Sequence, residues 1–409
     1  MNRTKTLLTL CLVFLAARAP AQTEWIEKLD QALHVESAKG WFQADLSGLA
    51  DFEGYVIDGN PPGLLFNEHD FLFNPRLSLF LDIQLGPHLY TFVQTRFDRG
   101  FDPGVDPDGD VRLDEYFLRY TPLDDARINL QFGKFATVVG NWIQRHDSWR
   151  NPFITAPVPY ENVIVISDQT VPGGPAAFLA RRDRVDQKVS WLPILWGPSY
   201  ATGGSIFGRL ETFEYAFEIK NASISSRPSI WEATELGWEY PTLSGRLGYR
   251  PSPTWSFGAS ASYGAYLLPA ARTTLGSGRS LGDYQQITIG TDAAYAWRHW
   301  QVWAEVFASR FEVPNVGNAD TLAYYIEAKY EFAPHWFGAL RWNQQIFDDV
   351  PDGAGGRKAW DRDLWRVDAA MTYRFDRHLQ AKLQYSYSHQ RGHFQQGEQL
   401  VAAQITVKF

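Results

Sequence analysis

Apolar and polar side chains alternate with a period of two residues along most of the chain from Trp41 onward, most plainly in 254–264, 364–375 and 401–409. In the second stretch, one face carries Trp365, Val367, Ala369, Met371, Tyr373 and Phe375, and the other carries Arg366, Asp368, Ala370, Thr372 and Arg374. Successive side chains of a β-strand point to opposite faces of a sheet. The pattern therefore predicts strands of about ten residues with lipid on one face and water on the other, as in transmembrane β-barrels.

Apolar and polar side chains also alternate along the strands of a soluble β-sandwich, but three features of the sequence argue against that fold. Charged side chains stand in the middle of the polar face, where a closed core would penalise them. The segments are long beside the usual strand of about five or six residues. Aromatic residues, 15% of the sequence, flank the short turns, as Tyr249 and Trp255 flank 250–253. An aromatic girdle of this kind marks a membrane interface, so the sequence favours a barrel in lipid.

Strand-like segments can be counted along the whole polar-apolar pattern. They begin near residues 41, 76, 89, 111, 126, 203, 213, 241, 254, 286, 300, 321, 335, 364, 378 and 400. Short connections at 86–88, 122–125, 209–212, 250–253, 298–299, 332–334 and 376–377 alternate with long ones at 54–75, 99–110, 135–202, 221–240, 265–285, 312–320, 347–363 and 388–399. We predict an all-β fold, a transmembrane antiparallel up-and-down β-barrel of about 16 strands, with 14 or 18 as alternatives. An open edge is costly in lipid, so strand 400–409 should pair with strand 41–53.

The N-terminus has the pattern of a secretory signal peptide. Arg3 and Lys5 precede an apolar run at 7–17, and small residues follow at 19–21. We predict cleavage after Ala21, which places the chain outside the cytoplasm. The expected organisation is a signal peptide at 1–21, a periplasmic N-terminal lead-in at 22–40 and a transmembrane barrel at 41–409. Cleavage would remove Cys11, the single cysteine, so neither thiol catalysis nor a cysteine metal site is expected.

The C-terminal stretch 405–409, which ends in Phe409, resembles the outer-membrane insertion signature of bacterial porins. The segments 92–100, 114–120 and 131–135 (FVQTRFDRG, DEYFLRY and QFGKF) resemble the phosphate-selective, anion-preferring porin type. The resemblance covers about the whole barrel. It implies a trimeric, sixteen-stranded channel of the Gram-negative outer membrane, in contact with lipid and lipopolysaccharide, whose third external loop folds inward.

The third long connection, 135–202, is far longer than ordinary loops, which favours a functional role. A barrel of sixteen strands leaves a wide aqueous channel unless something narrows it, and we expect this connection to fold into the lumen as a constriction loop. Rings of basic residues in a constriction favour anions. The candidate constriction residues are Arg145, Arg150, Arg181, Arg182, Arg184 and Lys188, and the candidate wall residues are Arg76, Arg96, Arg119 and Arg127. The alternative is a solvated external loop with incidental charges.

The function predicted from these features is a passive outer-membrane porin for small hydrophilic solutes or ions, with anions preferred. The alternative is a structural or surface-binding barrel, an adhesin or receptor, whose lumen is plugged. Enzyme activity is not expected, because the nine histidines are scattered and no H-E-x-x-H occurs. No cofactor and no metal site is expected, since the acidic stretch 102–110 does not match an EF-hand. The net charge of −8 gives no reason to expect a nucleic-acid partner.

Overall fold

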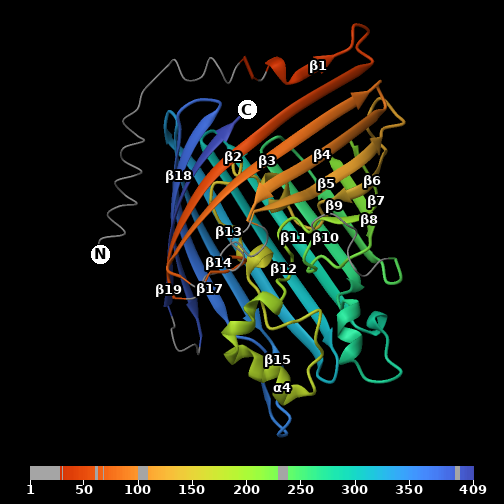
Figure 1. Ribbon diagram of the computed structural model, residues 1–409, viewed down its shortest axis with the longest axis vertical. Coiled ribbons are helices and arrows are strands. Elements are labelled where there is room, and N and C mark those ends of the chain that lie inside the picture. Colours follow the sequence, from red (N-terminus) through yellow and green to blue (C-terminus); the bar gives the residue numbers. More distant parts are fainter. Residues whose placement is uncertain are drawn as a thin grey trace.

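The fold is a closed antiparallel barrel, given by a computed structural model that describes residues 28–29, 31–59, 63–67, 69–99, 109–228, 238–391 and 397–409. Within these residues, sixteen strands form one sheet that closes on itself (Figure 1). The strand number predicted from the alternation is confirmed, and 14 and 18 are not. The predicted signal peptide at 1–21 and nearly all of the acidic stretch 102–110 lie outside the described residues.

The barrel strands follow one another in sequence order around the sheet. They are β2 (Phe42–Asp58), β3 (Phe71–Leu85), β4 (Leu89–Asp98), β5 (Asp110–Tyr120), β6 (Asn129–Phe135), β7 (Ala201–Leu210), β8 (Phe213–Lys220), β9 (Thr242–Tyr249), β10 (Trp255–Ala265), β11 (Gln285–Trp297), β12 (Trp300–Val313), β13 (Gly317–Ala333), β14 (Trp336–Phe347), β17 (Leu364–Arg374), β18 (Leu379–Gln390) and β19 (Gly397–Lys408).

The barrel closes between its last and first strands, as predicted. β19 pairs with β2 in a register that joins Gln399 to Asp58 and Lys408 to Leu49. The Phe409 amide donates to the Gly48 carbonyl at 3.1 Å, and the Gly48 amide donates back at 2.8 Å. A Cβ atom at position 48 would overlap the Phe409 ring, so this glycine leaves the space in which the terminal aromatic ring packs. Beyond the end of β19, the short strand β1 (His34–Glu36), part of the predicted lead-in, pairs with β2 instead.

The outer face of the barrel is apolar, because alternate residues of each strand point away from the lumen. On β14, the side chains of Leu340 and Trp342 are exposed, whereas Arg341 and Asn343 between and after them are buried. Aromatic pairs gather at the end with the short turns, where Trp300 lies 4.4 Å from Tyr330 and Trp336 lies 4.7 Å from Tyr373, measured between ring centroids. Both pairs lie beside short turns, the kind of position at which the sequence predicts an aromatic girdle.

The connections at one end are short and most of those at the other end are long. One prediction was wrong: 312–320 is a tight turn and not a long loop, because β12 and β13 remain paired up to Val313 and Gly317. The turn needs a positive φ at Asn315, which asparagine tolerates better than most residues. In the part of the chain that the structure describes, no helix has the length and apolar character needed to cross a membrane.

The connection between β6 and β7 contains five short helices. They are η2 (Trp142–Arg145), α3 (Val158–Glu161), α4 (Pro175–Ala180), η3 (Arg181–Asp183) and η4 (Val185–Ser190). Other long connections carry η5 (Pro269–Thr273), η6 (Leu281–Asp283) and the small hairpin of β15 (Asp349–Pro351) and β16 (Arg357–Ala359). In Figure 1, α4 and β15 lie together beyond the end of the barrel.

Candidate functional site

The connection 136–200, called the lumen loop below, lies against the inner face of one half of the barrel. Its buried residues Tyr160 and Phe178 form a continuous apolar cluster with Phe307 and Phe311 of β12 and with Trp360 of the β16–β17 connection. The two β12 side chains point inward, because Ala308 and Arg310, which alternate with them, point to the outer, exposed face. The loop that the sequence predicted to fold inward is therefore packed on the wall of β11–β14, β17 and β18.

Wall carboxylates hold the neck of the lumen loop where it leaves β6. Glu115 accepts from the Ala136 amide at 2.8 Å, and Glu218 accepts from the Thr137 hydroxyl at 2.5 Å. Glu305 of β12 accepts hydrogen bonds from the Trp142 amide at 2.6 Å, from the Tyr325 hydroxyl at 2.6 Å and from the Tyr160 hydroxyl. Gly140 lies against this group with a positive φ, and a Cβ atom there would overlap the Tyr160 hydroxyl. The backbone of the loop can therefore approach the wall closely at this point.

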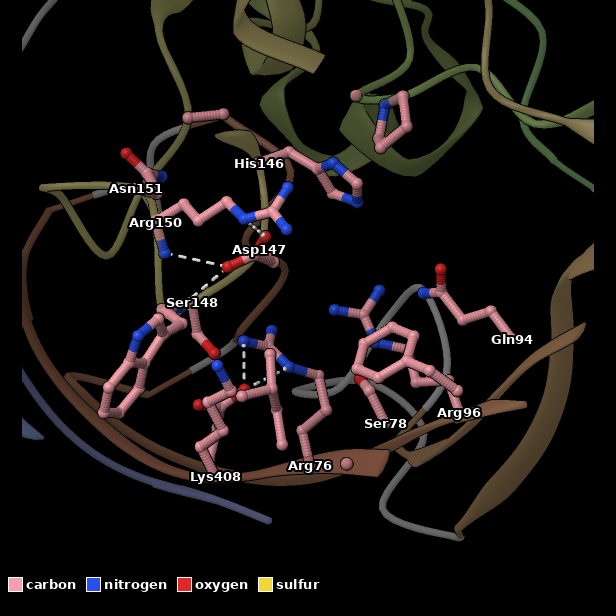
Figure 2. Close-up of a pocket in the computed structure, with 18 of the residues that line it drawn as sticks. Arg76, Ser78, Gln94, Arg96, His146, Asp147, Ser148, Arg150, Asn151 and Lys408 are labelled. Atoms are coloured by element: carbon pink, nitrogen blue, oxygen red, sulfur yellow. Dashed lines mark hydrogen bonds and ion pairs between the residues drawn. The ribbon is translucent and has the colours of Figure 1, made fainter. Parts of the chain in front are cut away.

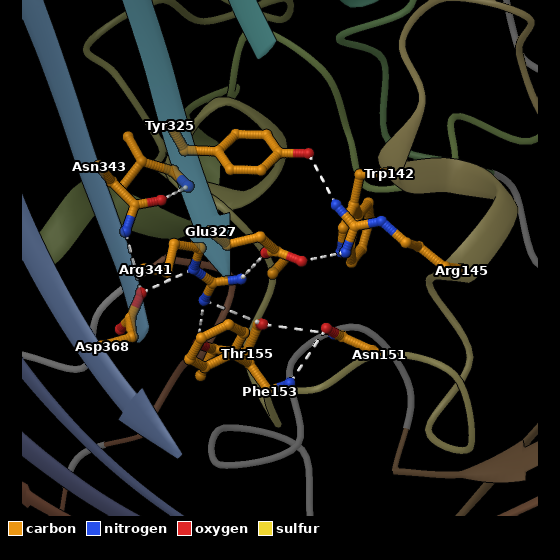
Figure 3. A network of polar contacts seen from close by, with 12 residues as sticks. Trp142, Arg145, Asn151, Phe153, Thr155, Tyr325, Glu327, Arg341, Asn343 and Asp368 are labelled. Carbon is orange, nitrogen blue, oxygen red and sulfur yellow. Dashed lines mark hydrogen bonds and ion pairs between the residues drawn. The ribbon is translucent and has the colours of Figure 1, made fainter. Parts of the chain in front are cut away.

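A buried network of charged side chains continues from this neck along the wall (Figure 3). Arg145 of the loop pairs with Glu327 of β13. Arg341 of β14 lies between Glu327, at 3.6 Å, and Asp368 of β17, at 2.8 Å, and also donates to the Thr155 carbonyl of the loop at 3.2 Å. Because each buried charge faces an opposite charge, the network avoids the large penalty of an isolated ion away from water.

A second loop carboxylate, Glu161 of α3, completes the network. It pairs with Arg366 of β17, whose guanidinium also donates to the Ala156 carbonyl at 2.6 Å. Burial raises the pKa of Glu161, and the nearby Arg366 and Arg341 oppose that rise. Loop and wall thus hold each other through ion pairs and backbone carbonyls over the length of 142–162.

The other half of the barrel wall keeps open space beside the lumen loop. A first cavity of about 560 Å³ lies between the strands β2–β5 and β19 and the loop residues 142–161. Figure 2 shows Arg76 and Arg96 on its wall, with His146, Asp147 and Arg150 on the loop. Its lining carries four basic side chains (Arg76, Arg96, Arg150 and Lys408) and five acidic ones (Asp51, Asp82, Glu115, Asp147 and Glu161). Burial lowers the pKa of His146, which favours its neutral form.

A second cavity of about 460 Å³ lies on the other side of the loop segment 135–144, against β5–β9. Its charged lining is different, with three arginines (Arg119, Arg209 and Arg246) and one acid (Glu214). Arg246 is paired with Asp292 at 2.5 Å. The two cavities are therefore unlike in charge: the first is nearly balanced and the second is basic.

The six candidate constriction residues do not come together in one place. Arg145 is buried in the ion-pair network, and Arg150 is exposed in the first cavity, 3.4 Å from Asp147. Arg181 and Arg182 donate to backbone carbonyls, of Thr170 at 2.9 Å and Ala359 at 2.8 Å, at the long-connection end. At the same end, Arg184 is exposed and follows η3. Lys188 donates to the Leu65 carbonyl at 2.8 Å. Only Arg150 of the six presents an exposed charge to a cavity.

The four candidate wall residues are also divided. Arg76 and Arg96 line the first cavity, and both have carboxylate partners, Asp51 at 2.9 Å and Asp98 at 3.3 Å respectively. Arg119 lines the second cavity. Arg127 differs from the expectation, because it precedes β6 on a short connection, with an exposed side chain paired to Asp125 at 2.8 Å. Three of the four therefore face the lumen.

Sequence reasoning missed the residues that fix the loop, namely Glu305, Glu327, Arg341 and Asp368. The alternation placed them on the inward face, where cross-strand ion pairs are the ordinary interpretation. A buried mid-strand charge is a signal that something covers it. Their loop partners lie about 160 to 200 residues away in sequence, beyond the reach of any local pattern.

Sequence reasoning also missed one hydrolase motif. Residues 278–282 (GRSLG) have the G-x-S-x-G spacing of a hydrolase nucleophile elbow. That motif works when the serine stands on a sharp strand-to-helix turn with a histidine beside it. Here Ser280 is half-buried and precedes η6, with its hydroxyl 3.0 Å from the Asp283 carboxylate, and within the described chain it forms no hydrogen bond with a histidine. Among the described residues, no group of three or more metal-ligating side chains is arranged to hold a metal ion.

Comparisons with known proteins identify the fold. No protein-family model and no curated protein matches the chain. Among solved structures, OmpF of Salmonella typhi in complex with daunomycin aligns at a TM-score of 0.57 and 15% identity, covering 92% of this chain and all of that one. The anion-selective porin of Comamonas acidovorans aligns at 0.55 and 11%, covering 90% and 100%. OmpT, an outer membrane protein of Vibrio cholerae, aligns at 0.56 and 9%, covering 92% and 99%. The barrel architecture is therefore that of outer-membrane porins.

Proposed function

We propose that this protein is a passive porin through which small hydrophilic solutes diffuse along the β2–β9 side of the lumen. The observation that carries the proposal is the pair of cavities that the lumen loop leaves open inside a closed barrel. Polar and charged side chains line both of them, and a water-filled path of this kind is how porins pass solutes.

The lumen loop would set the size limit of the channel. Its segment 142–161 borders the first cavity and is held to the opposite wall by buried ion pairs. A segment fixed in this way narrows the lumen without moving, which suits a channel that is always open. Of the residues expected to form a basic constriction, Arg150 is the one that we propose acts there.

We also propose that the channel has a modest preference for anions. Fixed charges in a narrow, low-dielectric passage raise the local concentration of ions of opposite sign. The charges that line the first cavity nearly cancel, whereas the second cavity carries three arginines and a single glutamate. We therefore assign the preference to the second cavity.

The location and assembly are also proposed. An apolar outer face with an aromatic girdle at one end suits a lipid bilayer, and we place the barrel in the outer membrane, among lipid and lipopolysaccharide, after cleavage of the signal peptide. A homotrimer is the proposed assembly, and one OmpT structure that the barrel resembles is described as a trimer form.

The competing function is a surface-binding barrel with a plugged lumen, which the extensive apolar core between the lumen loop and β12 favours. Liposome swelling with sugars of increasing size separates the two. A porin admits small sugars and rejects larger ones, while a plugged barrel admits none. The reversal potential in a KCl gradient then tests the ion preference, and a clear cation preference would contradict the assignment to anions.

A further inference from the structure

Arg119 stands apart among the charged side chains of the lumen. Its guanidinium carbon lies 5.3 Å from the ring centre of Tyr90, 5.2 Å from that of Phe117 and 5.1 Å from that of Phe207. Its Nε and Nη2 atoms donate to one and the same oxygen, Oε1 of Gln131, at 3.1 and 2.9 Å. Aromatic faces and one neutral oxygen therefore surround this cation.

Most other arginines of the lumen have a carboxylate partner. Arg76, Arg96, Arg112, Arg145, Arg246, Arg341 and Arg366 each form an ion pair with an aspartate or glutamate. Within the described chain, Arg119 forms none. Arg374 also has no ion pair there, but its guanidinium is covered by Trp149 of the lumen loop, with the ring centre at 4.6 Å. Arg119, by contrast, borders open space in the second cavity.

A guanidinium has five N–H groups, and the contacts with Gln131 leave Nη1 without a protein acceptor among the described residues. A cation that is partly removed from water gains most from an opposite charge placed on its open side. Glu115 attracts Arg119 electrostatically, but it forms no ion pair with it and accepts the Ala136 amide at 2.8 Å instead. The charged groups that line the second cavity do not provide a partner either. Glu214, its single acid, lies 3.3 Å from Arg250, and Asp292 is paired with Arg246.

We propose that the second cavity is a binding site for a small organic monocarboxylate with an apolar body. The carboxylate would occupy the open edge of Arg119, because planar guanidinium and carboxylate groups match in a two-bond geometry. The apolar body would lie against Phe135 and Phe207, which also line the cavity. Small residues such as Gly140 and Gly208 leave the space, and about 460 Å³ lies within the range of small-molecule sites.

This inference deepens the proposed channel function, since it names the solute class that pauses in the lumen. It also predicts which parts of the ligand matter. A single cation without an ion pair favours a ligand with one negative charge, and the aromatic side chains of the cavity favour a ligand with an apolar group. A neutral amide of the same shape and a short carboxylate without an apolar body should both bind worse than the complete ligand.

The test is isothermal titration calorimetry of the detergent-solubilised full-length protein with benzoate, with benzamide and acetate as matched ligands. Benzoate should bind, and each of the other two should bind at least about tenfold more weakly, since each lacks one of the two contacts. R119Q should weaken benzoate binding at least about tenfold. R119K keeps the positive charge but loses the planar guanidinium that can form two parallel hydrogen bonds with a carboxylate. Its affinity for benzoate should lie between those of R119Q and the unaltered protein.

Two further variants keep the test decisive. Ser205→Leu fills the cavity without changing Arg119 and should also abolish benzoate binding. Arg127→Gln removes an exposed cation of a neighbouring short connection, outside either cavity lining, and should bind benzoate as the unaltered protein does. Heat-modifiable migration on gels confirms that each variant is folded, and if R119Q fails this check, Ser205→Leu decides.

Three results would overturn the proposal: no benzoate binding, equal binding of benzoate and benzamide, or equal losses in R119Q and Arg127→Gln. Failure of the binding site and failure of the channel remain separable. A protein that conducts ions in a bilayer but does not bind benzoate is a porin without this site. A protein that binds benzoate through Arg119 and never conducts is a binding barrel.

Discussion

The two halves of the barrel wall share one sequence pattern and have different environments. On β11–β14, β17 and β18, the inward charges Glu305, Glu327 and Arg341 are buried beneath the lumen loop and bound to it. On β2–β9, inward residues such as Arg76 and Arg119 border open cavities. The same residue types therefore anchor a loop on one side and face the solute path on the other.

An inward position alone therefore does not determine whether a charged side chain anchors the loop or faces the solute path. A charged side chain beneath the loop must be paired, because burial of an isolated ion is costly. One beside a cavity keeps its hydration or can bind a solute. The following predictions test this division, in order of decreasing expected effect.

Arg341→Ala should cause the largest loss. Its side chain is fully buried between Glu327 and Asp368, and removing it leaves two carboxylates close together without their shared cation. We expect the free energy of unfolding to fall by about 3–5 kcal/mol, measured by urea unfolding in lipid vesicles with tryptophan fluorescence. Arg310→Ala is the matched control, since Arg310 and Asp320 form an exposed pair, whose loss should cost about 1 kcal/mol or less. Equal losses would contradict the division.

Glu305→Gln should release the neck of the lumen loop. The amide keeps the size of the side chain, but its NH₂ group cannot accept a hydrogen bond, and three donors compete for the remaining oxygen. We expect a loss of about 1–3 kcal/mol in unfolding free energy, together with larger and noisier single-channel currents in planar bilayers. Currents identical to those of the unaltered protein would show that the neck does not control the opening.

Lys188 should make the outer part of the lumen loop sensitive to pH. Burial lowers the pKa of its ammonium group from 10.5 to about 7, although the carboxylates of Glu398 and Glu161 oppose the shift. When this part of the loop unfolds locally, Lys188 becomes exposed and regains its ordinary pKa. The locally unfolded state therefore binds more protons than the folded state between pH 7 and 10.5. The stabilising contribution is fully present above pH 10.5 and is lost as the pH falls through about 7.

Hydrogen exchange of peptides that cover 187–192 measures this effect. After correction for intrinsic rates, exchange by local opening should slow by up to about tenfold per pH unit between pH 7 and 10.5. Lys188→Met should remove the dependence. Lys358→Met, at an exposed lysine of β16, should leave it intact, and a pH-independent rate in the unaltered protein would refute the assignment.

Arg150→Glu should have the smallest effect on stability and a measurable one on selectivity. Its side chain is 68% exposed, so the substitution changes the charge of the first cavity without breaking a buried pair. An exposed charge acts on a passing ion with about 1 kcal/mol at close range. We expect the anion-to-cation permeability ratio to fall by about twofold to fivefold, measured as reversal potential. Arg127→Glu, outside the lining of either cavity, is the control. An equal shift of the reversal potential in this variant would show that the overall surface charge, and not the charge in the first cavity, causes the change.

The sequence predicted the barrel well because the period of two is a local property that lipid and water impose on every strand. It predicted the strand starts to within about five residues, the closure between the last and first strands and the apolar outer face. It also predicted that 135–202 turns inward, from the length of this connection and from the resemblance to porins. It did not predict the paired turn at 314–316, because the strand pattern continues where a long loop was expected.

The roles of the basic loop residues could not be predicted. Arg181, Arg182 and Lys188 look like constriction charges in the sequence, yet they donate to backbone carbonyls near the long-connection end. Arg145 pairs with a carboxylate about 180 residues away. Such partners depend on how the loop crosses the lumen, which no local spacing encodes.

The most direct test of the account is the accessibility of single cysteines during conduction. Cys11 is the only cysteine of the sequence, so Ser78→Cys, Ser205→Cys and Ser309→Cys can be compared on one background. All three side chains have little exposed surface, but Ser78 and Ser205 line the two cavities, whereas Ser309 of β12 lines neither. A small charged methanethiosulfonate reagent should react with the first two and reduce the bilayer current, and should leave Ser309→Cys unchanged. Rapid reaction at Ser309→Cys, or none at the other two, would contradict a solute path along β2–β9.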